Sequence, residues 1–400
     1  MLQPRLATSL SNSRQSLFAR LFAGDVGIDP YTREISNIYQ DLFGESQFVG
    51  KGIYDVKTFD TVLGERFPED RILSHDMIEG SYTRCGFLND VEFVEEHPSR
   101  YLADISRRFR WARGDWQIAR WLLPTVPGPD GKPCRNPLSL LAKWMIIDNL
   151  RRTLMPLFFL VAFLLGWFGA ANVAMSWTSV LIAIFFLPNL LKTFQVLFVK
   201  PEHLRWYTHI AHAIRKESRI WLIDFLDLLQ IPFNAYFYVK AILLTAWRLL
   251  VSHRHMLEWQ TASDADKKVN NTLPGIFRTM WIAPLAVVVI IAMIVVTKFP
   301  AFAESSNWFR YIPHYSSGPW GLVITFALLT GWFLSPIIAW WLSRQNLPAS
   351  LEINKEHELF LRKTSRRTWA FFEQFVSKEN HWLPPDNFQE DFFVRQAHRT

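Results

Sequence analysis

The sequence predicts an α-helical polytopic membrane region that follows a smaller soluble region. Half of the 400 residues are hydrophobic, with 33 Phe and 18 Trp, and only 20% are charged. This composition is typical of a membrane protein with a soluble portion. Four apolar stretches, at about 153–170, 177–199, 279–298 and 320–343, each come close to the ~20 residues that a bilayer requires.

The net charge of +7 is concentrated in arginine clusters beside these apolar stretches. That placement indicates membrane topology, and because the usual basic recognition modules are missing we expect no nucleic-acid partner. The loops that separate the two pairs of apolar stretches are basic. The positive-inside rule therefore predicts that both hairpins extend outward and that the soluble parts lie in the cytosol.

The soluble region holds three recognisable elements. A Gly-Lys-Gly sequence at 50–52 indicates either a close approach of the backbone to another group or an ordinary turn before a strand at 53–56. Alternating apolar and polar residues at 82–96 predict a strand. A helix is expected from about Ser99, its N-cap, to Leu122.

Residues 125–142 form a Pro/Gly-containing hinge before a transmembrane region at 143–343. Within this region, 221–250 is apolar but carries charged residues, among them Asp227 and Lys240. We expect this stretch to be interfacial or re-entrant, with a spanning element as the alternative. Residues 344–400 are expected to be a cytosolic tail with an amphipathic helix around 352–376.

Two short sequences contain the candidate chemistry. In the first, residues 71–80, Asp76 and Glu79 lie three residues apart and share one face if the run is helical. A carboxylate there could take a proton from a hydroxyl group. Asp76 could equally cap the helix, and Glu79 could be an ordinary first-turn acid. His75 can titrate near neutrality.

The second sequence, residues 107–117, places a cationic and aromatic stripe on one helical face. Its members, at i, i+3, i+4 and i+7, are Arg107, Arg110, Trp111 and Gly114. Guanidinium groups can neutralise phosphate, and an indole can stack on a hexose. Gln117 is a further candidate for substrate binding. Arg108 and Arg113 project to other faces, where we expect contacts with solvent or lipid headgroups.

Both sequences resemble motifs of family 2 processive glycosyltransferases. Ser-His-Asp at 74–76 resembles their Thr-Glu-Asp, and Arg-x-x-Arg-Trp at 107–111 resembles their Gln-x-x-Arg-Trp. Longer stretches, such as "YQDLFGESQFVGKGIYDV", "RFPEDRILSHDMIEG" and "HWLPPDNFQED", resemble the glycosyltransferase domain of cyclic β-1,2-glucan synthases (family 84). The resemblance covers most of the chain and is most specific at 37–124. Arg107 stands where Gln is usual, which puts the acceptor contact of that position in doubt.

The resemblance implies that residues 1–124 are the C-terminal, acceptor-side part of an α/β, GT-A-like glycosyltransferase domain. A complete domain of this kind carries an Asp-x-Asp metal motif, and none precedes Asp76. Mg²⁺ or Mn²⁺ is therefore expected in the complete enzyme, with ligands outside this chain. We expect the chain to be a fragment that lacks an upstream donor half and a downstream domain.

The function implied by the resemblance is inverting glucosyl transfer from UDP-glucose to a growing cyclic β-1,2-glucan in the bacterial inner membrane. Asp76 would be the general base. The expected substrate-binding residues are Glu79, Arg107, Arg110, Trp111 and Gln117. The alternatives are a non-catalytic membrane fragment and a transporter or channel, although no inverted repeat supports the latter.

Overall fold

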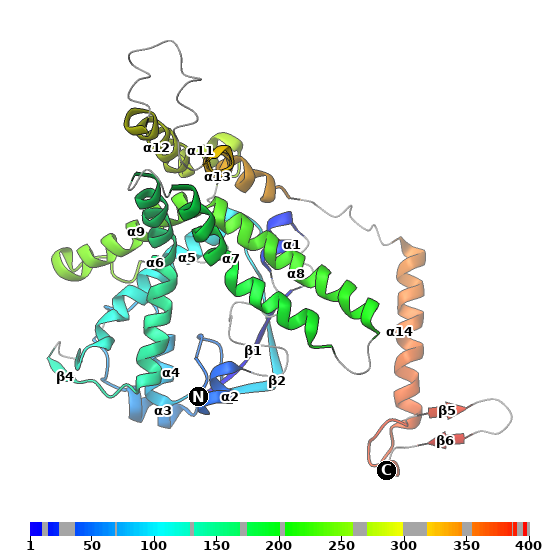
Figure 1. Cartoon of the computed structure of the whole chain (residues 1–400). Coiled ribbons are helices and arrows are strands. Elements are labelled where there is room, and N and C mark those ends of the chain that lie inside the picture. Colours follow the sequence, from blue (N-terminus) through cyan, green and yellow to red (C-terminus); the bar gives the residue numbers. More distant parts are fainter. Residues whose placement is uncertain are drawn as a thin grey trace. The chain divides into compact units, whose positions relative to one another are not determined.

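The computed structural model divides into two units, Met1–Asn346 and Leu347–Thr400 (Figure 1). It describes residues 1–9, 15–23, 37–68, 70–128, 132–168, 174–200, 205–258, 270–298, 318–345, 354–385, 387–389 and 395–397. The loop at 299–317 lies outside these ranges.

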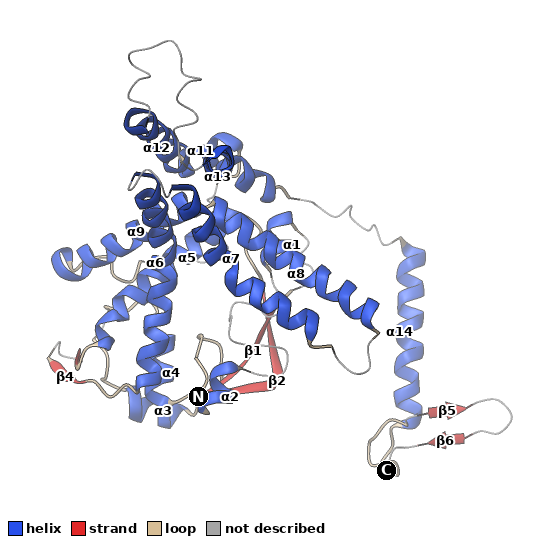
Figure 2. Ribbon diagram, in the orientation of Figure 1, coloured by secondary structure: helices blue, strands red, loops and turns tan. Residues whose placement is uncertain are grey.

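The soluble region contains short helices around one pair of strands (Figure 2). Strand β1 (Leu2–Thr8) runs parallel to β2 (Gly86–Glu95), which confirms the strand predicted at 82–96. The strand expected at 53–56 is absent from this described segment. Ile53 forms one antiparallel bridge with Leu2, and α3 (Val56–Leu63) then begins because the Asp55 side chain caps it. The other short helices are α1 (Leu17–Phe22), α2 (Ile38–Phe43) and α4 (Asp76–Thr83).

Helix α5 (Tyr101–Gln117) continues as a 3₁₀ helix, η2 (Ile118–Leu122), in agreement with the predicted helix at 99–122. Ser99 is not its N-cap, because Arg100 occupies that position without a side-chain cap bond. The carbonyl of Ser99 instead accepts a hydrogen bond from Ser16 Oγ (2.5 Å). The start of α5 is thus anchored by a tertiary contact.

The hinge folds into a small antiparallel hairpin of β3 (Thr125–Pro127) and β4 (Pro133–Arg135). Helix α6 (Leu140–Phe168) follows and, at 29 residues, exceeds the ~20 that cross a bilayer. Its first half packs against the soluble core, in which Trp121 is 2% exposed. Its second half places Phe163 and Trp167 in a core between apolar helices. One continuous helix therefore belongs to both regions.

The membrane region is confirmed as polytopic and helical. Among the described residues, four helices are long and apolar enough to cross a membrane, or five if a pair bent by 57° is one span. The candidate spans are Leu140–Phe168, Trp177–Phe198, Ile231–Ser252, Val323–Leu342 and the bent pair Leu273–Met280 with Ile282–Val296. The first two spans are α6 and α7 (Ala174–Phe198). The third combines α9 (Ile231–Trp247) with the π-helical turn η3 (Arg248–Ser252), and the fourth is α13 (Gly318–Leu342). The bent pair consists of α11 (Leu273–Met280) and α12 (Ile282–Lys298).

The ambiguous stretch at 221–250 is divided at Gln230 between two helices. Asp224 and Asp227 lie on α8 (Trp206–Leu229), whereas α9 begins with Pro232 in its first turn, a position that proline favours. Lys240 lies on α9. The charge that made this stretch ambiguous is therefore concentrated in the helix before the candidate span.

The second unit contains α14 (Lys355–Phe375) and a hairpin of β5 (Asn387–Gln389) and β6 (Arg395–Ala397). The helix confirms the one predicted at 352–376. Asn354 caps it by accepting a hydrogen bond from the His357 N–H at 2.8 Å.

An ion cluster around a buried carboxylate lies on α5, next to the turn that contacts the membrane region. Asp104, 1% exposed, pairs with Arg107 and with Arg108, each at 2.6 Å. Burial alone would raise the pKa of Asp104, but Arg108 and Arg107 hold this pKa below its usual value. One turn earlier, the Tyr101 hydroxyl donates to Asn234 Oδ1 of α9 at 3.2 Å. The polar and apolar contacts of α5 with α9 therefore lie together.

We predict that Asp104→Asn destabilises the protein by ~3–5 kcal/mol, because it leaves two partly buried guanidinium groups without their buried counter-charge. Unfolding of the purified protein in detergent would measure the loss. Asp41→Asn, a change of the same kind at an exposed position of α2, is the matched control. A loss no larger than that of the control would contradict the structural role of the cluster.

Candidate functional site

A cavity of about 710 Å³ lies where the soluble region meets the first apolar helix. This volume is within the ~300–1,000 Å³ usual for ligand sites. Asp76 contributes from the start of α4, Tyr238 from α9, and further residues come from α5, from α6 and from the loop at 47–51. The cavity brings together four of the six residues predicted for the site, namely Asp76, Arg107, Arg110 and Trp111.

Asp76 is the first residue of α4, and His75 rather than Asp76 occupies the N-cap position. Its carboxylate lines the cavity. Burial raises the pKa of Asp76; His75 lowers this pKa and Glu79 raises it further. A carboxylate with a raised pKa is a stronger base than a free aspartate.

The loop at 47–51 approaches Asp76 through a glycine. Gly50 has φ of +90°, and a Cβ added to it would lie 2.6 Å from Asp76 Oδ1. Any side chain there would therefore collide with the carboxylate, in a backbone conformation that residues with a Cβ rarely adopt. The close approach indicated by the Gly-Lys-Gly sequence is confirmed, and its partner is the candidate base.

The cationic stripe of α5 lies along the same cavity. Arg107 stacks over the Trp111 ring at 4.7 Å from the ring centroid, and its guanidinium is held by Asp104. Arg110 lies near both Arg107 and Asp76, and burial lowers its pKa. Lys51 adds another cation, paired with Glu95 at the end of β2. These positive charges suit a substrate or leaving group that carries phosphate.

Two predicted site residues lie elsewhere. Glu79 Oε1 pairs with His75 Nδ1 at 2.6 Å, and Glu79 does not line the cavity. Gln117 is 5% exposed, accepts a hydrogen bond from the Leu73 N–H (2.6 Å) and donates to the Met256 carbonyl (3.2 Å). Gln117 thereby connects the segment before Asp76 to the chain that follows α9.

The expectation that Arg108 and Arg113 contact solvent or lipid headgroups was wrong. Arg108 is paired with Asp104 and also lines the cavity. Arg113 is 5% exposed and donates to carbonyl groups of residues 255, 256 and 258. Arg108 lies three residues before Trp111, so the two side chains share a helical face. Arg113 lies on another face, and helical spacing did not show that the chain after α9 covers that face.

Sequence reasoning missed a polar group on the far wall of the cavity. Asp115 Oδ1 accepts a hydrogen bond from Asn149 Nδ2 of α6 at 3.2 Å, and Asn149 in turn accepts one from Arg152. All three residues line the cavity. Burial raises the pKa of Asp115 to about 7. The four-residue spacing from Trp111 to Asp115 was the available signal, whereas nothing in the sequence indicated that α6 would supply the partner.

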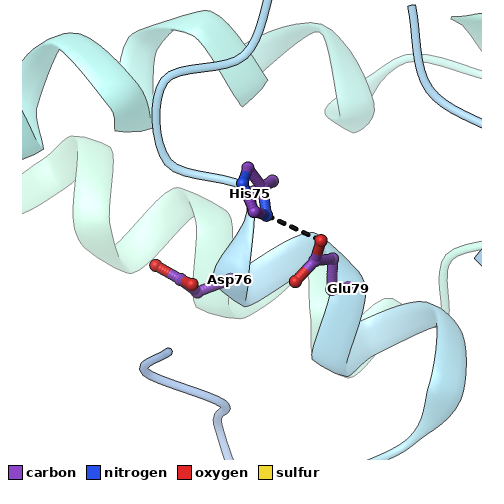
Figure 3. A group of neighbouring side chains, drawn as sticks. All are labelled: His75, Asp76 and Glu79. Atoms are coloured by element: carbon purple, nitrogen blue, oxygen red, sulfur yellow. Dashed lines mark ion pairs between the residues drawn. The ribbon is translucent and has the colours of Figure 1, made fainter. Parts of the chain in front are cut away.

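One group in the described part of the chain has the ligand types for a metal ion, namely His75, Asp76 and Glu79, with ligand atoms within 4.8 Å of one another. In Figure 3 the Asp76 carboxylate points away from the contact between His75 and Glu79. Glu79 raises the pKa of His75 by accepting its hydrogen bond, which favours an imidazolium that cannot bind metal. This donor set does not fit the expected Mg²⁺ or Mn²⁺, and we assign no metal to it.

Comparison with known proteins adds an independent observation. No protein-family model matches the chain. Over its full length the chain is 37% identical, across 404 aligned residues, to cyclic beta-(1,2)-glucan synthase NdvB of Rhizobium meliloti (strain 1021). The resemblance to cyclic β-1,2-glucan synthases is thus confirmed, and the chain spans 13% of the length of the relative that it matches.

The raised pKa of Asp115 predicts how the stability of the folded protein changes with pH. The folded protein holds a proton on Asp115 up to about pH 7, whereas the unfolded chain releases it near its usual pKa of 3.8. Stability should therefore fall as the pH rises between these values and then level off. Asp115→Asn stays neutral, so we expect this variant to gain stability relative to the unmodified protein between pH 5 and pH 8, by on the order of 2 kcal/mol.

Unfolding measured at several pH values, with exposed Asp41→Asn as control, tests this expectation. A difference between Asp115→Asn and the unmodified protein that does not change with pH would show that Asp115 is ionised throughout.

Proposed function

We propose that this chain forms the acceptor side of an inverting glucosyltransferase that extends a β-1,2-glucan from UDP-glucose. The observation that carries the proposal is the position of Asp76, whose carboxylate lies in one cavity with Arg110 and Trp111. The identity to a cyclic β-(1,2)-glucan synthase over the whole chain supports the same reaction. The GT-A-like character of residues 1–124 belongs to this proposal.

The proposed reaction is a single displacement. A hydroxyl group of the glucan acceptor attacks the anomeric carbon of UDP-glucose, Asp76 takes the hydroxyl proton, and the bond to UDP breaks with inversion. The raised pKa of Asp76 favours this proton transfer near neutral pH. Arg110 and Lys51 place positive charge where the leaving diphosphate gains negative charge.

Trp111 supplies the surface for sugar binding. Its ring is partly exposed to the cavity, and Arg107 covers it at 4.7 Å from the ring centroid. The other exposed parts of the ring can stack on a glucose residue of the acceptor. Arg107 therefore orients the indole, which gives a role to the arginine that replaces the usual glutamine.

Glu79 and Gln117 are proposed to position the site from outside it. Glu79 holds His75 beside Asp76, and Gln117 fixes the segment that precedes Ser74. Donor binding, and the Mg²⁺ or Mn²⁺ expected with it, are assigned to parts of the complete enzyme other than this chain. No step of the mechanism is derived through that metal.

We further propose that the module works at the bacterial inner membrane with its cavity on the cytosolic side. The basic loops between the apolar stretches support this orientation. Asn149 and Arg152 of α6 line the cavity, so a glucan held there lies next to the start of a candidate span. A non-catalytic fragment would show no dependence on Asp76, and a transporter would need no nucleotide sugar.

The decisive test is Asp76→Asn in a chimera in which this chain replaces the matching segment of the Rhizobium protein. The substitution is nearly isosteric and removes the proton acceptor, a contribution of ~10²–10⁴-fold in rate. We expect glucan synthesis to fall at least about a hundredfold while UDP-glucose binding, measured on the same preparation, is retained. If more than about a third of the activity remained, against this ~10²-fold expectation, Asp76 would not be the base.

Trp111→Ala should have a different kinetic effect in the same chimera. Loss of the stacking surface should raise the KM for a β-1,2-glucan acceptor by about tenfold, since an aromatic contact contributes ~0.5–1.5 kcal/mol beyond its buried area. The KM for UDP-glucose should change little. Trp369→Ala, an exposed tryptophan of α14, is the matched control. An equal effect on both substrates would argue against acceptor stacking.

A further inference from the structure

A second cavity, of about 330 Å³, lies outside the candidate active site. One wall is the last two turns of α9 and the turn that follows, with Ile242, Ala246 and Leu249. The opposite wall comes from the end of α5 and from η2, and includes Trp116 and Trp121. The cavity thus lies between a candidate membrane span and the soluble region.

The polar groups along the walls of this cavity already have partners. The indole N–H groups of Trp116 and Trp121 donate to Thr153 Oγ1 (3.0 Å) and to the Tyr82 hydroxyl (3.1 Å). The Thr245 hydroxyl donates to the Ala241 carbonyl at 2.8 Å. The surface that remains available on these walls is therefore hydrocarbon and aromatic, and such a surface suits an acyl chain.

The rim of the cavity has the opposite character. Arg71 and Arg120 both line it and are both exposed. Among the described residues neither has an ion-pair partner, whereas nearby Arg248 is paired with Glu258 at 2.7 Å. Two available guanidinium groups beside an apolar cavity complement an anionic headgroup that carries phosphate.

The exposed residues of α9 next to this cavity indicate that it lies at the level of the bilayer. The outer face of α9 exposes Leu243 and Trp247, which are 64% and 58% exposed. A helix that presents such residues outward faces lipid, and tryptophan favours the interface between lipid and water. An occupant can therefore reach the cavity directly from the bilayer.

We propose that this cavity binds an anionic phospholipid, with part of one acyl chain between α9 and Trp116 and the phosphate between Arg71 and Arg120. The volume, at the low end of the ~300–1,000 Å³ of ligand sites, fits part of a chain and not a whole lipid. The lipid contacts Trp116 and Gln117, one to two turns beyond Trp111 on the same helix. Binding therefore stabilises the end of the helix that lines the active-site cavity.

The test measures binding of phosphatidylglycerol to the purified full-length chain in neutral detergent, by native mass spectrometry, with phosphatidylcholine as reference. We expect phosphatidylglycerol to bind preferentially. The double substitution Arg71→Gln/Arg120→Gln should weaken it roughly 10–30-fold, since each basic residue near an anionic lipid contributes ~1 kcal/mol. Both positions are exposed, so folding should be retained.

Arg278→Gln is the matched control, because it removes an exposed arginine of α11 that does not line the cavity. This substitution should leave phosphatidylglycerol binding within about twofold of the unmodified protein, compared with the 10–30-fold loss expected at the rim. Ala246→Trp, which fills the cavity from α9, should weaken binding without changing the charge.

Three results would overturn the proposal. One is equal binding of the two lipids. Another is a loss for Arg278→Gln as large as that for the rim substitutions, which would indicate general surface charge. The third is full competition by inorganic phosphate alone, which would indicate an anion site without an acyl-chain requirement.

Discussion

The fold depends on how the Asp104 carboxylate is buried at the start of α5. Asp104 lies within 2.6 Å of both Arg107 and Arg108, and its neighbour Tyr101 reaches Asn234 on α9. Removing a charge from water is costly unless it is paired, so the two arginines allow this turn to be buried and the Tyr101 contact then orients the helix on α9. With this orientation fixed, Arg110 and Trp111 face the cavity and Arg113 turns toward the chain after α9.

The cavity of the candidate site also depends on the membrane region. Its walls include residues of α6 and Tyr238 of α9, in addition to Asp76 and the glycine loop from the soluble region. The apolar core beneath α5 likewise combines Leu102 and Ile105 with Phe233 and Phe237 of α9. The soluble region is thus not a separate body attached to a membrane anchor, because α5 belongs to the cores of both regions.

The sequence was sufficient for α6, α7, α12 and α13, for β2 and α14, and for the side-chain stripe on α5, but not for the candidate span Ile231–Ser252, which we had expected to be interfacial or re-entrant. These features follow from hydrophobic length and periodicity, which are local properties. At Gly50 the sequence left a close backbone approach and an ordinary turn open, and the structure decides for the close approach. The resemblance to cyclic glucan synthases, and not spacing, singled out Asp76 as a candidate base.

What sequence reasoning could not supply was the identity of contacts between distant segments. Nothing near Gln117 shows that Met256 accepts its hydrogen bond, and nothing near Asp115 points to Asn149. Ser99 looked like an N-cap because its residue type suits that position, but its carbonyl is engaged by Ser16 and the helix begins at Tyr101. Such outcomes are decided by tertiary packing, which overrides local preference.

Helix α6 is long enough to connect the bilayer with the cavity of the candidate site. At 1.5 Å per residue a helix of 29 residues is roughly 44 Å long, whereas the hydrocarbon layer is ~30 Å thick. The excess carries Asn149 and Arg152 into the cavity wall, and Pro156 lies between them and the apolar half. A bilayer thinner than the apolar half is accommodated by tilting of that half, and a proline inside a helix is the usual place for a bend between two such halves.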